Sequence, residues 1–301
     1  MGLHCWSSAH YVIPLPEGHR FPIAKYALLR DAVLARGLVL PGAMHDPARA
    51  PRAFVELAHT ADHVARFETG ALDEREQRAL GFPWSEALVE RAFRAVGGTV
   101  EAAAAALERG VAMNLAGGTH HAFADHGEGF CVFNDVAVAI RALQQDRRIV
   151  RAAVIDLDVH QGNGTHAIFA GDATVTTFSM HGGKNYPFRK VPGTHDIELP
   201  DGCTDGPYLA LLEGALPAVL REARADLVIY LAGADPHEED RLGRLKLTYE
   251  GLKRRDELVL ATCREIGLPI CLTIAGGYGH DVATTVAVHL NTVAVAARYA
   301  S

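Results

Sequence analysis

The stretch AAVIDLDVHQGNG, residues 152–164, gives the clearest indication of the fold. Its first half is a short apolar run without polar alternation, which is typical of a strand buried on both faces. Three more runs share this pattern: TVTTFSM (174–180), DLVIYLAG (226–233) and PICLTIAGG (269–277). Helical patterns follow the last three, at residues 208–225, 249–266 and 281–300. This alternation predicts an α/β fold with a central, mainly parallel β-sheet flanked by helices on both faces.

The composition predicts one domain and excludes several classes of protein. The 301 residues show no repeat, linker or change in composition, so we expect a single domain over residues 1–301. With 29 basic and 36 acidic residues, the net charge of −7 argues against nucleic-acid binding and weakly suits a cationic substrate. We expect no membrane segment and no signal peptide. Five scattered cysteines without CxxC spacing indicate free thiols, and we therefore expect a cytoplasmic protein.

Polar side chains follow each of the four predicted strands. In parallel sheets, ligands bind at the carboxyl ends of the strands, so we expect these side chains to converge. They are Asp156, Asp158, His160, Ser179, His181, Asp235, His237 and Tyr278.

The pattern Asp156-Leu-Asp158-Val-His160 predicts a metal site. These three polar side chains recur at every second residue and would share one face of an extended chain end. Two carboxylates and an imidazole pointing the same way favour a cation between them, and Asp235 can add a further carboxylate. One histidine and two carboxylates suit a catalytic zinc or ferrous ion. The alternative is a solvated acidic turn after the strand. The QGNG segment that follows predicts a tight loop close to the backbone, which favours the metal site over this alternative.

The adjacent His120 and His121 are candidates for the general acid and base. Adjacent side chains diverge on a helix or strand, so both can reach one site only from an irregular loop, which Gly117-Gly118 allows. Two surface histidines without a role are the alternative. Tyr278 follows another glycine pair and could donate a hydrogen bond to an oxyanion, although a plain turn is the commoner explanation for Gly-Gly-Tyr.

In combination, these segments resemble the successive motifs of the histone deacetylase family. The motifs are GGTHHAFADHGEGFCVFND, DLDVHQGNGTHAIF, LAGADPHEEDRLGRLKLT and AGGYGHD, in this order, and the resemblance runs from about residue 14 to beyond residue 281. DxDxHxGNG and DPHEEDRLG are most similar to class IV deacetylases, and the short chain is similar to bacterial histone deacetylase-like amidohydrolases. The resemblance implies the arginase/deacetylase fold and zinc-dependent removal of acyl groups from lysine side chains.

The resemblance also implies catalytic roles. His121 would act as general base and then as general acid, His120 would assist electrostatically, and Tyr278 would donate to the developing oxyanion. Asp156 would support His120, and Asn163 would support His121. Because a carboxylate favours an imidazolium and an amide does not, we expect His120 to be charged and His121 to be neutral.

The metal ligands follow from the same resemblance. Asp158, His160 and Asp235 would bind one zinc ion per chain. The related arginases need aspartates where this chain has Gly162 and His237, so we reject a two-metal ureohydrolase. A structural potassium ion would be held by Asp156, Asp158, His160, Ser179 and the Met180 carbonyl.

The substrate channel would be formed by Gly129, Phe130, Val191, Leu242, Gly276 and Gly277. Class I deacetylases have a second phenylalanine where Val191 stands, before Pro192-Gly193-Thr194. Its loss predicts a wider channel and acyl chains longer than acetyl. Alternatively, a neighbour such as Tyr186, Phe188 or Leu242 refills the gap.

Two other functions compete with a protein deacylase. One is hydrolysis of a small acylated amine such as an acetylpolyamine, although the chain has no obvious long insertion to narrow the entrance. The other is a non-catalytic acyl-lysine binder, which would lack one of the zinc ligands, His121 or Tyr278. The sequence leaves the oligomeric state, the choice between zinc and iron and the physiological substrate open.

Overall fold

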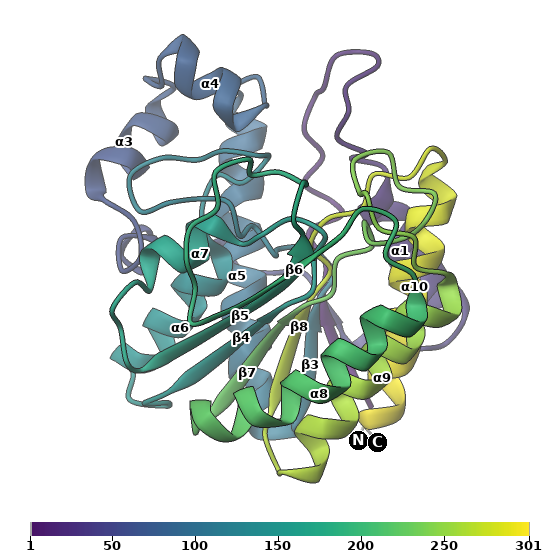
Figure 1. The fold of residues 1–301 in the computed structure, drawn as a ribbon. Helices are drawn as coiled ribbons and strands as arrows, with labels where there is room; N and C mark the ends of the chain where they lie inside the picture. The colour runs from purple at the N-terminus through teal and green to yellow at the C-terminus, as the bar shows by residue number, and fades with distance from the viewer. Residues whose placement is uncertain (1, 301) are drawn as a thin grey trace.

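A computed structural model describes residues 2–300 of the chain, and Figure 1 shows their arrangement. The elements in chain order are β1 (His4–Trp6), α1 (Lys25–Ala35), the 3-10 helix η1 (Pro41–Ala43), β2 (Met44–His45), α2 (Arg52–Val55), α3 (Ala61–Thr69), α4 (Glu74–Leu80), α5 (Glu86–Arg109), β3 (Val111–Asn114), α6 (Asp135–Gln145), β4 (Ala152–Asp156), α7 (Asn163–Ile168), β5 (Val175–Gly182), β6 (His195–Leu199), α8 (Asp205–Ala223), β7 (Leu227–Leu231), α9 (Tyr249–Glu265), β8 (Ile270–Thr273) and α10 (Val282–Tyr299).

The strands form one sheet in the order β2-β1-β3-β8-β7-β4-β5-β6, and every neighbouring pair is parallel. This confirms the predicted α/β fold. The four strands expected from the sequence, β4, β5, β7 and β8, are neighbours in the middle of the sheet, and all their residues are buried. Burial on both faces explains why apolar residues occur at both odd and even positions of these runs.

Helices cover both faces of the sheet, and the side chains of β4 show how the two hydrophobic cores are divided. Ala153 and Ile155 belong to one core, together with residues of α1, α8, α9 and α10. Ala152 and Val154 belong to the other core, with residues of α5 and α6. The two helical layers are seen on opposite sides of the sheet in Figure 1. The alternation follows from the two-residue period of a strand.

The remaining strands were not expected. β1, β2 and β3 have only 3, 2 and 4 residues, which is too short for a recognisable pattern. β6 lies at the edge of the sheet, and its residues alternate between partly buried and exposed along most of its length. Sequence patterns therefore located the middle of the sheet and missed its edges.

The parallel topology brings the loops that follow the strands to one edge of the sheet, at the top of Figure 1. Residues 115–134 join β3 to α6, residues 183–194 join β5 to β6, and residues 232–248 join β7 to α9. Among the described residues, no helix is long and apolar enough to cross a membrane. The five cysteines are buried free thiols, as expected.

Candidate metal and catalytic site

Three loops that follow neighbouring strands meet at this edge of the sheet. Asp158 follows β4, Asp235 follows β7 and Gly276 follows β8. Backbone amides link the loops, since Val159 N donates to Asp235 Oδ1 at 3.0 Å and Gly276 N donates to Asp158 Oδ2 at 2.8 Å. Because β8, β7 and β4 are adjacent, residues more than a hundred positions apart come together as the sequence predicted.

Asp158, His160 and Asp235 form a buried group with the composition of a metal site. One ligand atom from each residue lies within 4.8 Å of the others. His160 Nδ1 is 3.0 Å from Asp158 Oδ1 and 3.2 Å from Asp235 Oδ2. Both carboxylates are fully buried, and among the described residues only the His160 ring lies close to Asp235 Oδ2. Two buried carboxylates that share a single imidazole fit a site for a cation.

The protonation of this group also favours a cation. Burial and the Asp158 carboxylate raise the pKa of Asp235 to about 7. Burial lowers the pKa of His160, but hydrogen bonds to Asp158 and Asp235 outweigh it and raise the pKa to about 10. In the metal-free protein a proton on His160 thus balances part of the carboxylate charge. A divalent cation can take over this role, and its ligand set of one imidazole and two carboxylates suits zinc.

Gly276 must be glycine for the carboxylates to lie so close together. A Cβ atom at this position would lie 2.0 Å from Asp235 Oδ2 and 2.6 Å from Asp158 Oδ2. Any side chain here would therefore displace a candidate metal ligand. Gly276 was predicted to contact the substrate. The structure gives it a further role, because the absence of a side chain makes room for the two carboxylates.

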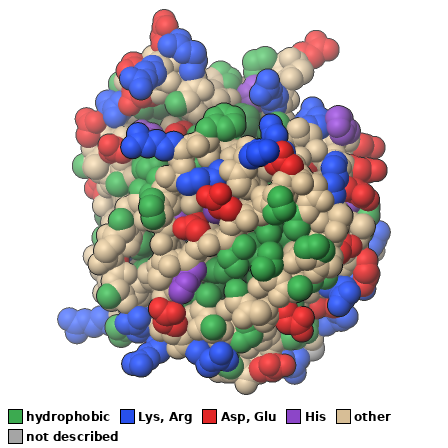
Figure 2. Space-filling view, in the orientation of Figure 1, with side chains coloured by type: hydrophobic (Ala, Val, Ile, Leu, Met, Phe, Trp, Pro, Cys, Tyr) green, Lys and Arg blue, Asp and Glu red, His purple; other side chains and the backbone are tan. Residues whose placement is uncertain are grey.

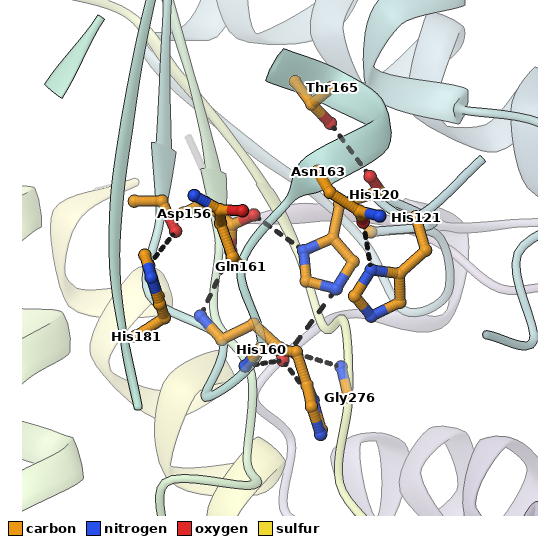
Figure 3. A network of polar contacts seen from close by, with 12 residues as sticks. His120, His121, Asp156, His160, Gln161, Asn163, Thr165, His181 and Gly276 are labelled. Atoms are coloured by element: carbon orange, nitrogen blue, oxygen red, sulfur yellow. Dashed lines mark hydrogen bonds and ion pairs between the residues drawn. The ribbon is translucent and has the colours of Figure 1, made fainter. Parts of the chain in front are cut away.

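His120 and His121 lie on an irregular loop, as expected, and their rings are 4.1 Å apart. His120 Nδ1 is 2.7 Å from Asp156 Oδ2, and His121 Nδ1 is 2.7 Å from Asn163 Oδ1 (Figure 3). Burial opposes the charge on His120, but the carboxylates of Asp156 and Asp158 outweigh it and raise its pKa to about 9. Burial and the charges of His120 and His160 lower the pKa of His121 well below 6.5. At neutral pH, His120 is therefore an imidazolium and His121 is neutral.

A second contact of Asn163 fixes the tautomer of His121. Asn163 Nδ2 donates to Glu128 Oε1 at 2.6 Å, so the amide must turn its oxygen toward His121. That oxygen accepts a hydrogen bond from the Nδ1–H of His121, which leaves the lone pair on Nε2. Glu128 also accepts a hydrogen bond from Tyr186. Glu128 thus orients His121, the candidate base, through two successive hydrogen bonds that run by way of Asn163. Sequence analysis missed this role.

Tyr278 lies beside the candidate metal ligands and is held through its backbone. Its N–H donates to Asp240 Oδ2 at 2.6 Å, and its carbonyl accepts from Arg241 Nε at 3.0 Å. Burial and the charges of Asp235 and Asp158 raise the pKa of its phenol well above 10. The phenol therefore keeps its proton and can donate a hydrogen bond.

Three cavities adjoin the site, two small inner ones and a larger one that opens to solvent. A small cavity of about 50 Å³ is bordered by His120, His121, Asp158, His160 and Tyr278. Behind it, a second cavity of about 50 Å³ is lined mainly by apolar side chains. Toward solvent, a cavity of about 450 Å³ opens to the surface. One water molecule needs about 10–15 Å³ by this measure, so each inner cavity holds only a few atoms.

The walls of the outer cavity differ in part from the prediction. Gly129, Phe130 and Leu242 line it, as expected. Val191 does not, because its backbone is turned toward the protein, where its N–H donates to Gln161 and its carbonyl accepts from His166. Tyr186 lines this wall instead, and its ring lies 4.9 Å from that of His121 at 87°. Tyr186 was one of the neighbours named as the alternative that could refill the gap left at Val191, and the structure places it on this wall.

Two further expectations were wrong. Gly277 turns away from the channel, since a Cβ atom there would contact Thr285 Cγ2 at 2.7 Å. His237 does not join the metal ligands, because its ring lies 4.4 Å from that of Tyr249 on α9. His237 was expected at the site because it follows the strand run of β7, but the chain forms a turn after Asp235, in which His237 N donates to the Ala234 carbonyl.

Ser179 and Met180 lie on β5, next to β4, and both are buried. Ser179 is the register partner of Asp156, and its hydroxyl contacts His181 Nδ1 at 2.9 Å. His181 therefore lies behind the site, and it contacts Ser179 instead of the candidate metal ligands.

Lys25 is another site residue that sequence analysis missed. It borders the small inner cavity, is 1% exposed, and its Nζ donates to the Ala275 carbonyl at 3.2 Å. The ammonium also lies 5.6 Å from the centre of the Tyr278 ring. A lysine in the apolar stretch FPIAKYALL was the available signal, because lysine is almost never fully buried without a specific partner.

Comparisons with known proteins place the chain in a family. Residues 19–295 match the histone deacetylase domain. Histone deacetylase 2 of Arabidopsis thaliana is 32% identical over 280 residues, which cover 89% of this chain and 72% of that protein. A probable deacetylase of Methanothermobacter thermautotrophicus is 34% identical over 198 residues, which cover 60% of this chain and 58% of that protein. An uncharacterized protein of Picosynechococcus is 46% identical over 90% of this chain and 91% of its own length.

Solved structures agree on the fold. The HD domain of HDA15 superposes with a TM-score of 0.83 at 21% identity, over 99% of this chain and 89% of that one. An HDAC homolog solved in complex with SAHA has a TM-score of 0.82 at 23% identity, over 98% and 84%. The chain therefore belongs to the histone deacetylase family, whose members are hydrolases of amide bonds.

Proposed function

We propose that this chain is a zinc-dependent lysine deacylase whose residues 1–301 form one catalytic domain, of the class IV or bacterial amidohydrolase type. The observation that carries the proposal is the buried Asp158–His160–Asp235 group beside two imidazoles, of which His120 pairs with a carboxylate and His121 with an amide oxygen. A binding protein would need neither a base held by an amide oxygen nor two buried carboxylates that share one imidazole.

Asp158, His160 and Asp235 would hold the zinc ion. When bound, zinc supplies Lewis acidity, which polarises the acyl carbonyl and lowers the pKa of a water molecule to about 7. Asp156, Ser179 and Met180, with Asp158 and His160, would hold a structural potassium ion. Their burial and the pairing of Asp156 with Ser179 support this second site.

The protein side chains would move the protons of hydrolysis. His121 Nε2 accepts a proton as the water oxygen bonds to the acyl carbon, and Tyr278 donates a hydrogen bond to the carbonyl oxygen as it gains negative charge. The positive charge on His120 stabilises that negative charge. When the C–N bond breaks, His121 returns its proton to the leaving amine. The products are a carboxylate and a free lysine side chain.

The inner cavities favour a short acyl group. The two inner cavities, of about 50 Å³ each, have room for only a few atoms, which suits an acetyl group, whereas a decanoyl chain would extend beyond them. Tyr186 lines the outer cavity at the wall where Val191 was expected to leave the channel wider. We therefore favour acetyl over the longer chains suggested by the sequence.

The test compares acetyl-lysine and decanoyl-lysine peptides before and after removal of metal with a chelator. We expect hydrolysis of the acetyl peptide to disappear with the metal and to return with added zinc. Full activity after chelation would contradict the metal site, and faster turnover of the decanoyl peptide would contradict the short-chain preference.

A further inference from the structure

The entrance to the site is more basic than the chain as a whole. Arg20, Lys184, Arg241 and Arg244 line the outer cavity, and no carboxylate from the described residues lines it. Yet the chain has a net charge of −7. On the face seen in Figure 2, acidic and basic side chains are mixed. The clustering of cations at the entrance is therefore a local feature.

Little of this positive charge is neutralised. Arg244 Nη1 and Lys184 Nζ share one carboxylate, that of Asp201, at 3.0 and 4.0 Å. The guanidinium of Arg241 donates to two carbonyls, those of Tyr278 and Arg20, at 3.0 and 3.4 Å. All four cations are exposed, and of these Arg20 and Arg241 form no ion pair with a carboxylate of the described residues.

Two of the other carboxylates on the surrounding loops, those of Asp240 and Glu128, serve internal contacts, and Glu239 accepts a hydrogen bond from the Thr284 hydroxyl. Asp240 is 8% exposed and accepts hydrogen bonds from the backbone amides of Leu242, Gly243 and Tyr278. Glu128 accepts from Asn163 and is not part of the cavity wall. Neither Asp240 nor Glu128 is placed to neutralise a substrate-facing cation.

We propose that this basic rim selects acyl-lysines that lie in acidic peptide segments. The inference rests on the proposed deacylase function and specifies its substrate. In an extended peptide each residue spans about 3.3 Å, so residues within three positions of the acyl-lysine lie within about 10 Å of the channel mouth. This is the screening length at an ionic strength of about 0.1 M, so their charges interact with the rim. Phe188, 88% exposed on the same wall, adds an apolar contact.

The same rim repels cationic substrates. Acetylpolyamines and lysine-rich peptides would bring positive charge to Arg20, Lys184 and Arg241. The structure thus weighs against the cationic substrate that the overall charge suggested. A single exposed ion pair changes a binding constant by up to about fivefold, so two or three together predict a preference of about tenfold or more.

The experiment uses acetyl-lysine peptides of one length with glutamate, glutamine or lysine at the flanking positions, and an acetylpolyamine. We expect kcat/KM to fall in the order glutamate, glutamine, lysine, with about a tenfold span at low salt and a small span at about 0.5 M salt. The salt series needs no variant. Equal rates for the three peptides, or faster hydrolysis of the lysine-flanked peptide or the acetylpolyamine, would overturn the inference.

Charge reversal identifies the residues responsible. The double variant Arg20→Glu/Lys184→Glu should reverse the ratio of the glutamate and lysine peptides. The matched control is Arg221→Glu, because Arg221 is exposed on α8 near its carboxyl end, away from the entrance, and this change should leave the ratio as in the wild type. An unchanged ratio in the double variant, or an equal change in the control, would contradict the assignment to the rim.

Anisotropy of fluorescein-labelled peptides separates this inference from the proposed function. If no peptide is hydrolysed, the proposed function fails, but the ratio of dissociation constants still tests the rim. Tighter binding of the glutamate peptide supports the inference, and equal or weaker binding contradicts it.

Discussion

The floor and the rim of the site are built in different ways. On the floor, Asp158 and Asp235 are fully buried, and backbone amides from neighbouring loops donate to both carboxylates. At the rim, Arg20 and Phe188 are exposed and belong to long connecting loops. The sheet therefore fixes the groups that carry out the chemistry, and the loops set the charge that a substrate meets. Substitutions on the floor should affect catalysis, and those on the rim should affect the choice of substrate.

The largest effect is expected at Tyr278. Tyr278→Phe removes the hydroxyl that would donate to the oxyanion, and kcat should fall about 10²- to 10³-fold. Steady-state rates on an acetyl-lysine peptide measure this effect, and the metal content should stay at the wild-type level. A loss of metal would instead make Tyr278 a structural residue of the floor.

Arg255 tests how the floor is supported from below. It is fully buried on α9, and its Nη1 donates to the carbonyls of Gly233 at 2.7 Å and Leu157 at 3.2 Å. Leu157 directly precedes Asp158, and Gly233 lies two residues before Asp235. Arg255→Met should therefore lower zinc affinity about 10- to 100-fold, measured by competition with a chromogenic chelator.

A second variant separates support of the metal site from stability. Arg255 pairs with Asp256 at 2.8 Å, so Arg255→Met alone leaves a buried charge and should cost about 3–5 kcal/mol in the free energy of unfolding. The double variant Arg255→Met/Asp256→Leu should recover part of this stability without recovering zinc affinity, because it removes the unpaired charge but leaves the buried hydroxyls of Tyr230 and Thr292 without their acceptor. Recovery of both would show that Arg255 only stabilises the fold.

A smaller effect concerns the pH dependence of the base. The pKa of His121 lies well below 6.5, so the wild-type enzyme should lose activity only as the pH falls through that low value. Asn163→Asp would place a carboxylate beside His121 and raise its pKa, which moves the acidic limb of the kcat/KM profile upward. Glu128 Oε1 lies 2.6 Å from Asn163 Nδ2, so an aspartate at position 163 would place two carboxylates side by side, and they would repel each other. The change should therefore be made together with Glu128→Gln. An unmoved limb in the double variant would contradict the role of Asn163.

The smallest effect is expected at the rim. Phe188→Ala should change the free energy of unfolding by no more than about 0.5 kcal/mol, because the side chain is 88% exposed. The buried Phe178 on β5 is the matched control, and its change to alanine should cost about 3–5 kcal/mol. Urea unfolding of both variants measures the difference. A large loss at Phe188 would show that the rim is packed more firmly than its exposure indicates.

The sequence predicted the floor better than the rim for physical reasons. β4, β5, β7 and β8 are buried on both faces, so their apolar runs are visible in the sequence, and parallel pairing then brings Asp158 and Asp235 together. Val191 was misplaced because residues 183–194 form no strand or helix, and no regular pattern defines their path. Glu128 and Lys25 were missed because their contacts join loops and helices distant in the sequence.

The most direct test measures the zinc content and the hydrolysis rate of the same protein samples. The wild-type protein should carry one zinc ion per chain, and its rate on an acetyl-lysine peptide should rise in proportion to the zinc bound. Asp235→Asn, which keeps the shape of the side chain and removes its charge, should lose both. A metal-free wild-type protein with full activity, or an Asp235→Asn variant with the wild-type rate, would contradict the metal site.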